Sequence, residues 1–229
     1  MCLAQHKTSL LHIGSKNPNY SYNINSIPII PVQNARDLGL LTDSTLKFAL
    51  HITRISASAV LKCKQLLKYF KSSSPEFYMS LFKCYVLPIL EYSSVLFSPH
   101  PSSRLSQCLE KPLRQYTKLI LQRCNIPFNS YENRLELLNM YSIRHRRLKN
   151  QLILLHNIVT GASHFPNISA HVRPSTSTRR PMNLIVVNPK SNDFFSTVVP
   201  IWNAIFANTP TYLLPSQIST TIDKSILRY

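Results

Sequence analysis

Hydrophobic and polar residues follow two different periods along this chain. Before Asp43 the apolar residues come in short runs between turn-forming residues, a pattern that predicts short strands. Two of these runs, residues 20–24 and 27–32, flank Asn25-Ser26 and predict a hairpin. A further short apolar stretch covers residues 35–41. After Asp43 the period lengthens to about 3.6 residues, which predicts helices.

The helical part contains clear start and stop signals. Ser74-Pro75-Glu76 marks a helix start, because serine can cap the helix, proline suits its first turn and glutamate favours the positive end of the helix dipole. Pro88 then bends or restarts that helix. Beyond the helix that begins after Asp43, helices are expected at residues 75–87, 103–123, 142–160 and 192–207, with a short one from Ser130.

These elements predict a fold that is mainly α-helical with a small N-terminal antiparallel β segment, an α+β chain built on a helical bundle. Residues 1–43 hold the β segment and residues 44–160 the helical domain. Residues 161–191 are basic and rich in Pro, Ser and Thr, which is typical of a linker. Residues 192–229 are expected to form a C-terminal docking helix and a tail.

The charge balance indicates a polyanionic partner. The chain has 26 Lys and Arg against 9 Asp and Glu, a formal net charge of +17 at pH 7. A surplus of this size attracts nucleic-acid phosphate first and anionic membrane surfaces next. A solvated basic surface without a specific ligand is the alternative. The basic residues that repeat on helical faces are the candidate nucleic-acid contacts: Lys62, Lys64, Lys68, Lys71, Arg114, Lys118, Arg144, Arg146, Arg147 and Lys149.

One of these basic runs stands where a helix tolerates positive charge poorly. Arg144, Arg146 and Arg147 lie at the predicted start of the helix at residues 142–160, and positive charge there opposes the helix dipole. An anion bound nearby would explain this arrangement. A loose, solvated helix end would explain it equally well.

The chain lacks the residue patterns of common catalytic sites. Asp37 and Asp43 are the only aspartates in the strand-like segment, and they are not the adjacent pair that polymerases carry on a tight turn. Glu132 and Glu136 lie one helical turn apart, a spacing typical of solvated charges. No G-x-S-x-G, G-x-x-x-x-G-K-S/T or H-E-x-x-H motif occurs. The sequence therefore predicts no catalysis by the chain alone, no cofactor and no small-molecule substrate.

Cysteine spacing and hydropathy indicate the cellular compartment of the chain. The five cysteines are widely separated and form no C-x-x-C pair, so a structural zinc site is not expected. The same spacing indicates a protein of a reducing compartment. No run of about 18 apolar residues occurs, which predicts no membrane span. The first residues lack the apolar core of a signal peptide. An intracellular protein, cytoplasmic or nuclear, is expected.

Two longer motifs resemble segments of a known enzyme family. Residues 35–48 read ARDLGLLTDSTLKF, and residues 85–94 read YVLPILEYSS. The first is similar to the segment that follows the catalytic palm in the reverse transcriptases of non-LTR retrotransposons, of the LINE-type, jockey-like group. The second resembles their thumb helices. Further agreement, in the expected order, lies at residues 109–118, 130–135, 144–148, 194–195 and 202–203.

This resemblance implies an RNA-directed DNA polymerase ancestry and a thumb-like helical bundle. It implies that Leu38 and Gly39 lie in the hairpin that grips the primer end, that residues 1–43 are a remnant of the palm and primer grip, and that the helices bind over a duplex. The palm, with the aspartates that bind magnesium in the full-length family, is expected upstream of Met1. The chain alone is thus expected to be a catalytically incomplete fragment.

Three hypotheses follow. The first is a thumb fragment that binds RNA or RNA–DNA duplex. The second is an interaction module or an inert relic, which would show no salt-dependent binding to nucleic acid. The third is part of an active reverse transcriptase whose palm is supplied by an upstream segment or a partner chain. The first is preferred, because it explains the net charge of +17 and needs no missing part.

Overall fold

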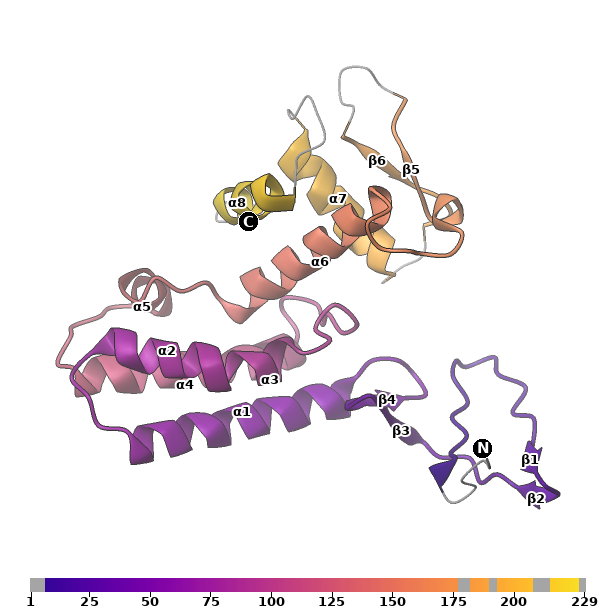
Figure 1. The fold of residues 1–229 in the computed structure, drawn as a ribbon, viewed down its shortest axis with the longest axis horizontal. Coiled ribbons are helices and arrows are strands. Elements are labelled where there is room, and N and C mark those ends of the chain that lie inside the picture. The colour runs from indigo at the N-terminus through magenta and orange to yellow at the C-terminus, as the bar shows by residue number, and fades with distance from the viewer. Residues whose placement is uncertain (1–6, 177–181, 190–192, 208–214, 227–229) are drawn as a thin grey trace. The chain divides into compact units, whose positions relative to one another are not determined.

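The chain folds as two compact units in the computed structural model, which describes residues 7–176, 182–189, 193–207 and 215–226 (Figure 1). The units are Met1–Ile143 and Arg144–Tyr229. About 53% of the described residues are helical, and the strands form small antiparallel pairs. The predicted fold class, mainly α with a small N-terminal antiparallel β segment, is therefore confirmed.

Two short hairpins open the first unit. The strands that pair are β1 (Asn23–Ile24) with β2 (Ile27–Pro28), and β3 (Asn34–Asp37) with β4 (Leu40–Asp43). The two turn residues have φ angles of 50° and 64° at Asn25-Ser26, and of 44° and 88° at Leu38-Gly39. Turns with positive φ at both positions match the twist of paired strands, so each hairpin needs only two turn residues. The hairpin around Asn25-Ser26 is the predicted one, although its strands are shorter.

The helices of the first unit follow in sequence. They are α1 (Ala49–Tyr69), α2 (Pro75–Tyr85), α3 (Leu87–Glu91), α4 (Arg104–Arg123) and α5 (Tyr131–Leu137). Serine side chains cap three of these helices, as predicted for Ser74, whose Oγ accepts the Phe77 N–H at 3.1 Å. A new helix starts beside Pro88, because proline cannot donate the backbone hydrogen bond that would continue α2.

The first helix begins later than the sequence pattern predicts. The Asp43 carboxylate accepts backbone N–H groups from Thr45, Lys47 and Phe48 at 2.8, 3.3 and 2.9 Å. These bonds hold the residues after β4 in a loop, so α1 starts only at Ala49. The hydrophobic period continued through this loop and gave no sign of it.

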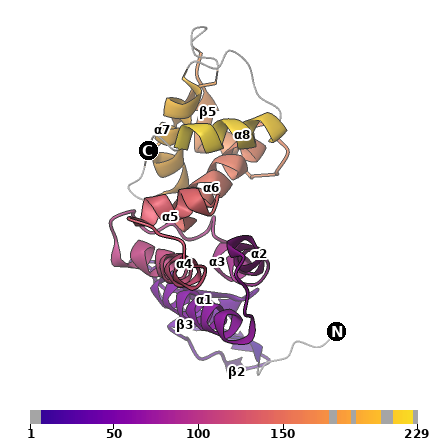
Figure 2. The same cartoon turned by 90° about the vertical axis from the view of Figure 1, so that its left-hand side faces the viewer.

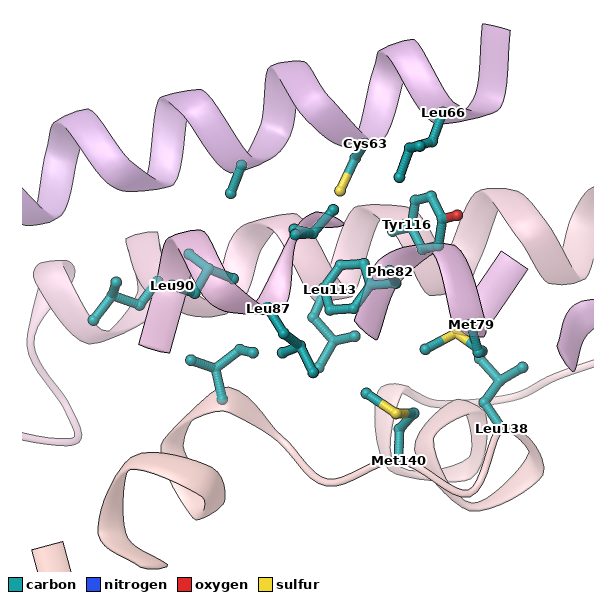
Figure 3. Packing of buried hydrophobic residues seen from close by; sticks show 14 of the residues in the cluster. Cys63, Leu66, Met79, Phe82, Leu87, Leu90, Leu113, Tyr116, Leu138 and Met140 are labelled. Carbon is teal, nitrogen blue, oxygen red and sulfur yellow. The ribbon is translucent and has the colours of Figure 1, made fainter. Parts of the chain in front are cut away.

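The core of the first unit lies between α1, α2 and α4. α1 packs along α4, and α2 lies against both; Figure 2 shows the three helices nearly end-on. In Figure 3, Cys63 and Leu66 of α1 gather with Phe82 of α2 and with Leu113 and Tyr116 of α4. Because each helix buries this apolar stripe, its basic residues remain largely on the outer side.

The second unit has a core of its own. Its elements are α6 (Ile143–Val159), η2 (Ile168–Ala170), β5 (Val172–Pro174), β6 (Leu184–Val186), α7 (Phe194–Phe206) and α8 (Pro215–Ile226). Trp202 is fully buried, and its Nε1–H donates to the Met182 carbonyl at 2.9 Å. The Asn203 side chain exchanges two hydrogen bonds with the backbone of Leu184, at 2.8 and 2.9 Å. Residues 202–203, which carry part of the sequence resemblance, thus fasten α7 to β6.

The structure differs from the predicted domain organisation. The unit boundary lies at Ile143 and Arg144, whereas the sequence placed boundaries after residues 43, 160 and 191. Residues 161–191 were predicted to be a linker, yet their described part contains η2 and the β5–β6 hairpin, with Val172 and Leu184 buried. The reason is that these apolar side chains join the core around α7, a long-range contact that composition does not report. Residues 177–181 and 190–191 of that segment lie outside the described residues.

Candidate nucleic-acid interface

The outer side of α4 carries positive charge without negative charge. The helix has one acidic residue, Glu110, which is only 8% exposed. Its exposed basic residues are Arg104, Lys111, Arg114, Lys118 and Arg123. Arg104, Lys111 and Lys118 follow at intervals of seven residues, which puts them on one face of the helix. A helix face of this kind is suited to contact the phosphates of a nucleic acid.

The outer side of α1 has the same character. The helix contains no acidic residue, and Arg54, Lys64 and Lys68 are exposed. Lys64 and Lys68 lie one turn apart, and the Lys68 ammonium is 5.7 Å from the centre of the Tyr69 ring. Lys62 is partly buried and points away from this stripe. Of the lysines predicted on α1, Lys64 and Lys68 are therefore the better placed to contact phosphate.

Arg114 is held against the protein. Its guanidinium carbon lies 4.2 Å from the centre of the Tyr131 ring, and that of Arg134 lies 5.3 Å from the same ring. The pKa of the Glu132 carboxyl is lowered, first by a backbone hydrogen bond and further by the charges of Arg114 and Arg134. Because Glu132 partly balances Arg114, Lys118 is the less compensated of the two cations predicted on α4.

A buried carboxylate supports this side of the unit. Glu110 accepts a hydrogen bond from the Tyr131 hydroxyl and another from the Ile143 N–H, the latter at 3.1 Å. Burial, followed by the nearby Glu110, raises the pKa of Tyr131, so that its hydroxyl stays protonated and able to donate. Glu110 thereby ties α5 and the chain at Ile143 to the middle of α4.

The hairpin tip predicted to grip a primer end is exposed and tethered. Leu38 is 84% exposed, and its carbonyl accepts the Tyr92 hydroxyl at 2.7 Å. A Cβ atom at Gly39 would lie 3.6 Å from the Tyr92 ring, an ordinary contact, but the φ of 88° disfavours any other residue. Tyr92, which the sequence did not single out as functional, thus fixes the tip relative to α3.

The four basic residues predicted on α6 lie in the second unit, and they differ in exposure. Arg144 is exposed and Arg146 partly so. Arg147 is 3% exposed, so the prediction that it contacts nucleic acid is wrong, because its guanidinium is enclosed by protein. The ammonium of Lys149 lies 2.5 Å from the carboxylate of Asp223 in α8, which already balances its charge. Arg144 and Arg146 therefore remain as candidates on this helix.

The same aspartate also reaches a histidine. His145 is 7% exposed, and its Nε2 lies 3.3 Å from Asp223 Oδ1. Desolvation lowers the pKa of His145, although Asp223 opposes this effect. The neutral imidazole is thus favoured in the fold.

Comparison with known proteins identifies a relative. The sequence is 36% identical over 197 residues to a Caenorhabditis elegans protein that bears the name Uncharacterized protein B0403.1. The match covers 82% of this chain and 99% of the nematode protein. The chain belongs to the family of that nematode protein. No protein-family model and no solved structure matches the sequence.

The residues predicted to contact nucleic acid did not include several basic residues of α4. Arg104 and Lys111 share the face of Lys118, and their seven-residue spacing was the signal that could have revealed them. Arg123 lines an open hollow of about 510 Å³ together with Lys71, the last predicted residue of the α1 run. No spacing rule brings residues 71 and 123 together, because only the packing of α1 on α4 does so.

Over the described ranges, no group of three or more His, Cys, Asp or Glu side chains is placed to hold a metal ion. Among the helices in those ranges, none combines the length and the apolar character that crossing a membrane requires.

Proposed function

We propose that this chain binds nucleic-acid duplex, RNA or RNA–DNA, as a catalytically incomplete, thumb-like relative of non-LTR retrotransposon reverse transcriptases. The observation that carries the proposal is the outer side of α4, where every exposed charged residue is basic and the one acidic residue is buried. The acid-free α1 adds a second stripe of the same sign.

The physical basis is the release of counterions from the nucleic acid. Each phosphate that a Lys or Arg neutralises adds about 0.9 to the slope of log K against log salt for a duplex. Contacts from Lys64, Lys68, Lys111 and Lys118 would give a slope of about −3.6 by this rule. Such a slope is steep enough to measure between low and physiological salt.

The test is fluorescence anisotropy of the full chain with labelled RNA–DNA hybrid, duplex DNA and single-stranded RNA over a salt series. We expect binding that weakens steeply with salt. The double variant Lys111→Ala, Lys118→Ala should flatten the slope by about 1.8. These two lysines are exposed, so the fold should survive their replacement, as circular dichroism would check.

The matched control is Lys7→Ala, Lys16→Ala, which removes the same charge from exposed positions outside the helical bundle. If both double variants change the slope equally, the binding is diffuse and the α4 interface is refuted. If the folded wild-type chain binds none of the three nucleic acids, the proposed function fails altogether.

A second candidate function, a protein-interaction module, is favoured by apolar side chains in the strand region. Leu38, Ile30 and Tyr20 are 84%, 79% and 66% exposed. Clustered exposed apolar residues are typical of a surface that another protein covers. In that case, a partner should protect these residues from solvent, and nucleic-acid binding should show little dependence on salt.

A further inference from the structure

An open hollow lies where the loop between α1 and α2 meets the last turn of α4. Lys71, Ser72, Ser73 and Arg123 line it, and its volume is about 510 Å³. Three of these residues belong to one loop, and Arg123 comes from a helix 50 to 52 residues further along the chain. All four side chains can donate hydrogen bonds, and two of them carry a positive charge.

Arg123 is oriented by the protein before any ligand arrives. Its Nη1 donates to the carbonyls of Leu67 and Phe70, at 2.8 and 3.2 Å, and to the Tyr78 hydroxyl at 3.0 Å. These acceptors engage one nitrogen of the guanidinium, which has five N–H donors in all. The remaining donors are therefore presented in a fixed direction, with less side-chain entropy left to lose on binding.

The loop that supplies the other three residues is also fixed. The Tyr78 hydroxyl accepts the Ser72 N–H at 2.9 Å and donates to the Phe70 carbonyl at 3.1 Å, and Tyr78 itself is fully buried. The Ser72 Oγ accepts the Ser74 N–H at 3.0 Å. A single buried hydroxyl thus links the loop to Arg123, so the two sides of the hollow hold their positions together.

The Lys71 side chain is not fixed in this way. It is exposed, and among the described residues it has no hydrogen-bond, ion-pair or ring partner. A free ammonium beside a guanidinium with unused donors leaves two positive charges that no acidic side chain of the described residues pairs at close range.

We propose that this hollow binds a phosphate group of the nucleic-acid backbone, held by the guanidinium of Arg123, the ammonium of Lys71 and the hydroxyls of Ser72 and Ser73. Arginine and lysine in combination are well suited to a phosphodiester, because arginine offers a fixed pair of donors and lysine a mobile charge. The inference rests on the proposed function, and it assigns one definite phosphate contact to it.

One acidic residue lies close enough to oppose the ligand. Glu76, in the first turn of α2, accepts the Ser74 hydroxyl at 2.8 Å. Desolvation raises the pKa of the Cys124 thiol, the Glu76 charge raises it further, and the Arg123 charge lowers it. The charges of Glu76 and Arg123 therefore both act on Cys124, the residue that follows Arg123. Glu76→Gln should strengthen phosphate binding by roughly twofold to fivefold at low salt.

The first experiment uses inorganic phosphate and the ¹H–¹⁵N NMR spectrum of the full chain. We expect saturable shifts of the amides of residues 71–74 and of the Arg123 side chain. Lys71→Ala should weaken this binding at least threefold, whereas Lys83→Ala, which removes an exposed lysine of α2 away from the hollow, should leave it unchanged. Shifts that fail to saturate, or that spread equally over α1 and α4, would overturn the proposal.

The second experiment repeats the salt series on the labelled RNA–DNA hybrid. Lys71→Ala should reduce the slope by about 0.9. Arg123→Lys keeps the charge but loses the paired donors, so it should weaken hybrid binding while the slope stays nearly constant. If the wild-type chain binds hybrid with a steep slope and Lys71→Ala behaves like Lys83→Ala, the phosphate site is refuted and the proposed function stands. If no hybrid binds, the function fails, and the phosphate titration still decides whether the hollow is an anion site.

Discussion

Replacing the buried carboxylate of Glu110 should test how the first unit is held together. In Glu110→Ala the Tyr131 hydroxyl and the Ile143 N–H both lose their acceptor. Tyr131 is 8% exposed and Ile143 is fully buried, so water cannot readily replace the carboxylate. The variant therefore leaves two buried donors without their partner.

The magnitude follows from these two donors. A hydrogen bond to a charged group contributes about 1.5–3 kcal/mol, and an unsatisfied buried donor costs about 1–3 kcal/mol. Glu110→Ala should then lower the free energy of unfolding by about 3–5 kcal/mol. Tyr131→Phe, which removes only one of the two donors, should lower it by about 1.5–3 kcal/mol. Glu110→Gln keeps an acceptor oxygen and should cost less than Glu110→Ala.

The assay is urea unfolding followed by circular dichroism for the two single variants and the double variant, with hydrogen exchange at the Ile143 amide as a local probe. The double-mutant cycle should give a coupling energy above about 1 kcal/mol between Glu110 and Tyr131. The Ile143 amide should exchange faster in Glu110→Ala and not in Tyr131→Phe. A loss below about 1 kcal/mol in Glu110→Ala would refute the reasoning, because it would mean that neither donor depends on the carboxylate.

Three further predictions concern other parts of the chain. Partial burial raises the pKa of Asp43, but hydrogen bonds from Thr45, Lys47 and Phe48 outweigh this effect and lower it. The contribution of Asp43 to stability should therefore be present above about pH 4 and be lost as the pH falls below that value. Asp43→Ala should cost about 1–2 kcal/mol in thermal unfolding at neutral pH and less in acid. Because desolvation lowers the pKa of His145, the second unit should lose stability as the pH falls below about 6.5, and His145→Gln should abolish this part of the pH dependence in a denaturation series. The double variant Arg144→Ala, Arg146→Ala should flatten the salt slope of hybrid binding by up to about 1.8, and an unchanged slope would mean that neither arginine contacts the hybrid.

Local signals in the sequence predicted much of the helical part. Ser74-Pro75-Glu76 and Pro88 act within one or two helical turns, so their effects on α2 and α3 could be deduced without knowledge of the fold. The two-residue turn at Asn25-Ser26 is equally local. Such signals need no partner from elsewhere in the chain.

The errors arose where distant residues decide the outcome. Val172 and Leu184 stand in a polar stretch that resembles a linker, and only α7 turns that stretch into a packed hairpin. Ile218 and Ile222 are buried in α8, although the sequence predicted only a tail after the docking helix. Tertiary contacts override local composition at such positions.

The candidate site was predictable in its charge and less so in its geometry. The basic surplus indicated nucleic acid, and Lys64, Lys68 and Lys118 are exposed as expected. The burial of Arg147 could not be foreseen, because a charged residue is seldom enclosed by protein. The pairing of Lys71 with Arg123 depends on how two helices pack, which helical periodicity does not determine.

The packing of α1 on α4 has a consequence for synthesis of the chain. Leu67 is joined to Arg123 across a separation of 56 residues, so α1 leaves the ribosome long before its partner helix exists. At translation rates of about 5–20 residues per second, that interval lasts roughly 3–11 s. During this time the apolar stripe that includes Ile52 and Leu66 is uncovered and open to chaperones or to aggregation. Synonymous codon changes that slow translation between α1 and α4 should therefore lower the yield of soluble protein, even though the amino-acid sequence is unchanged.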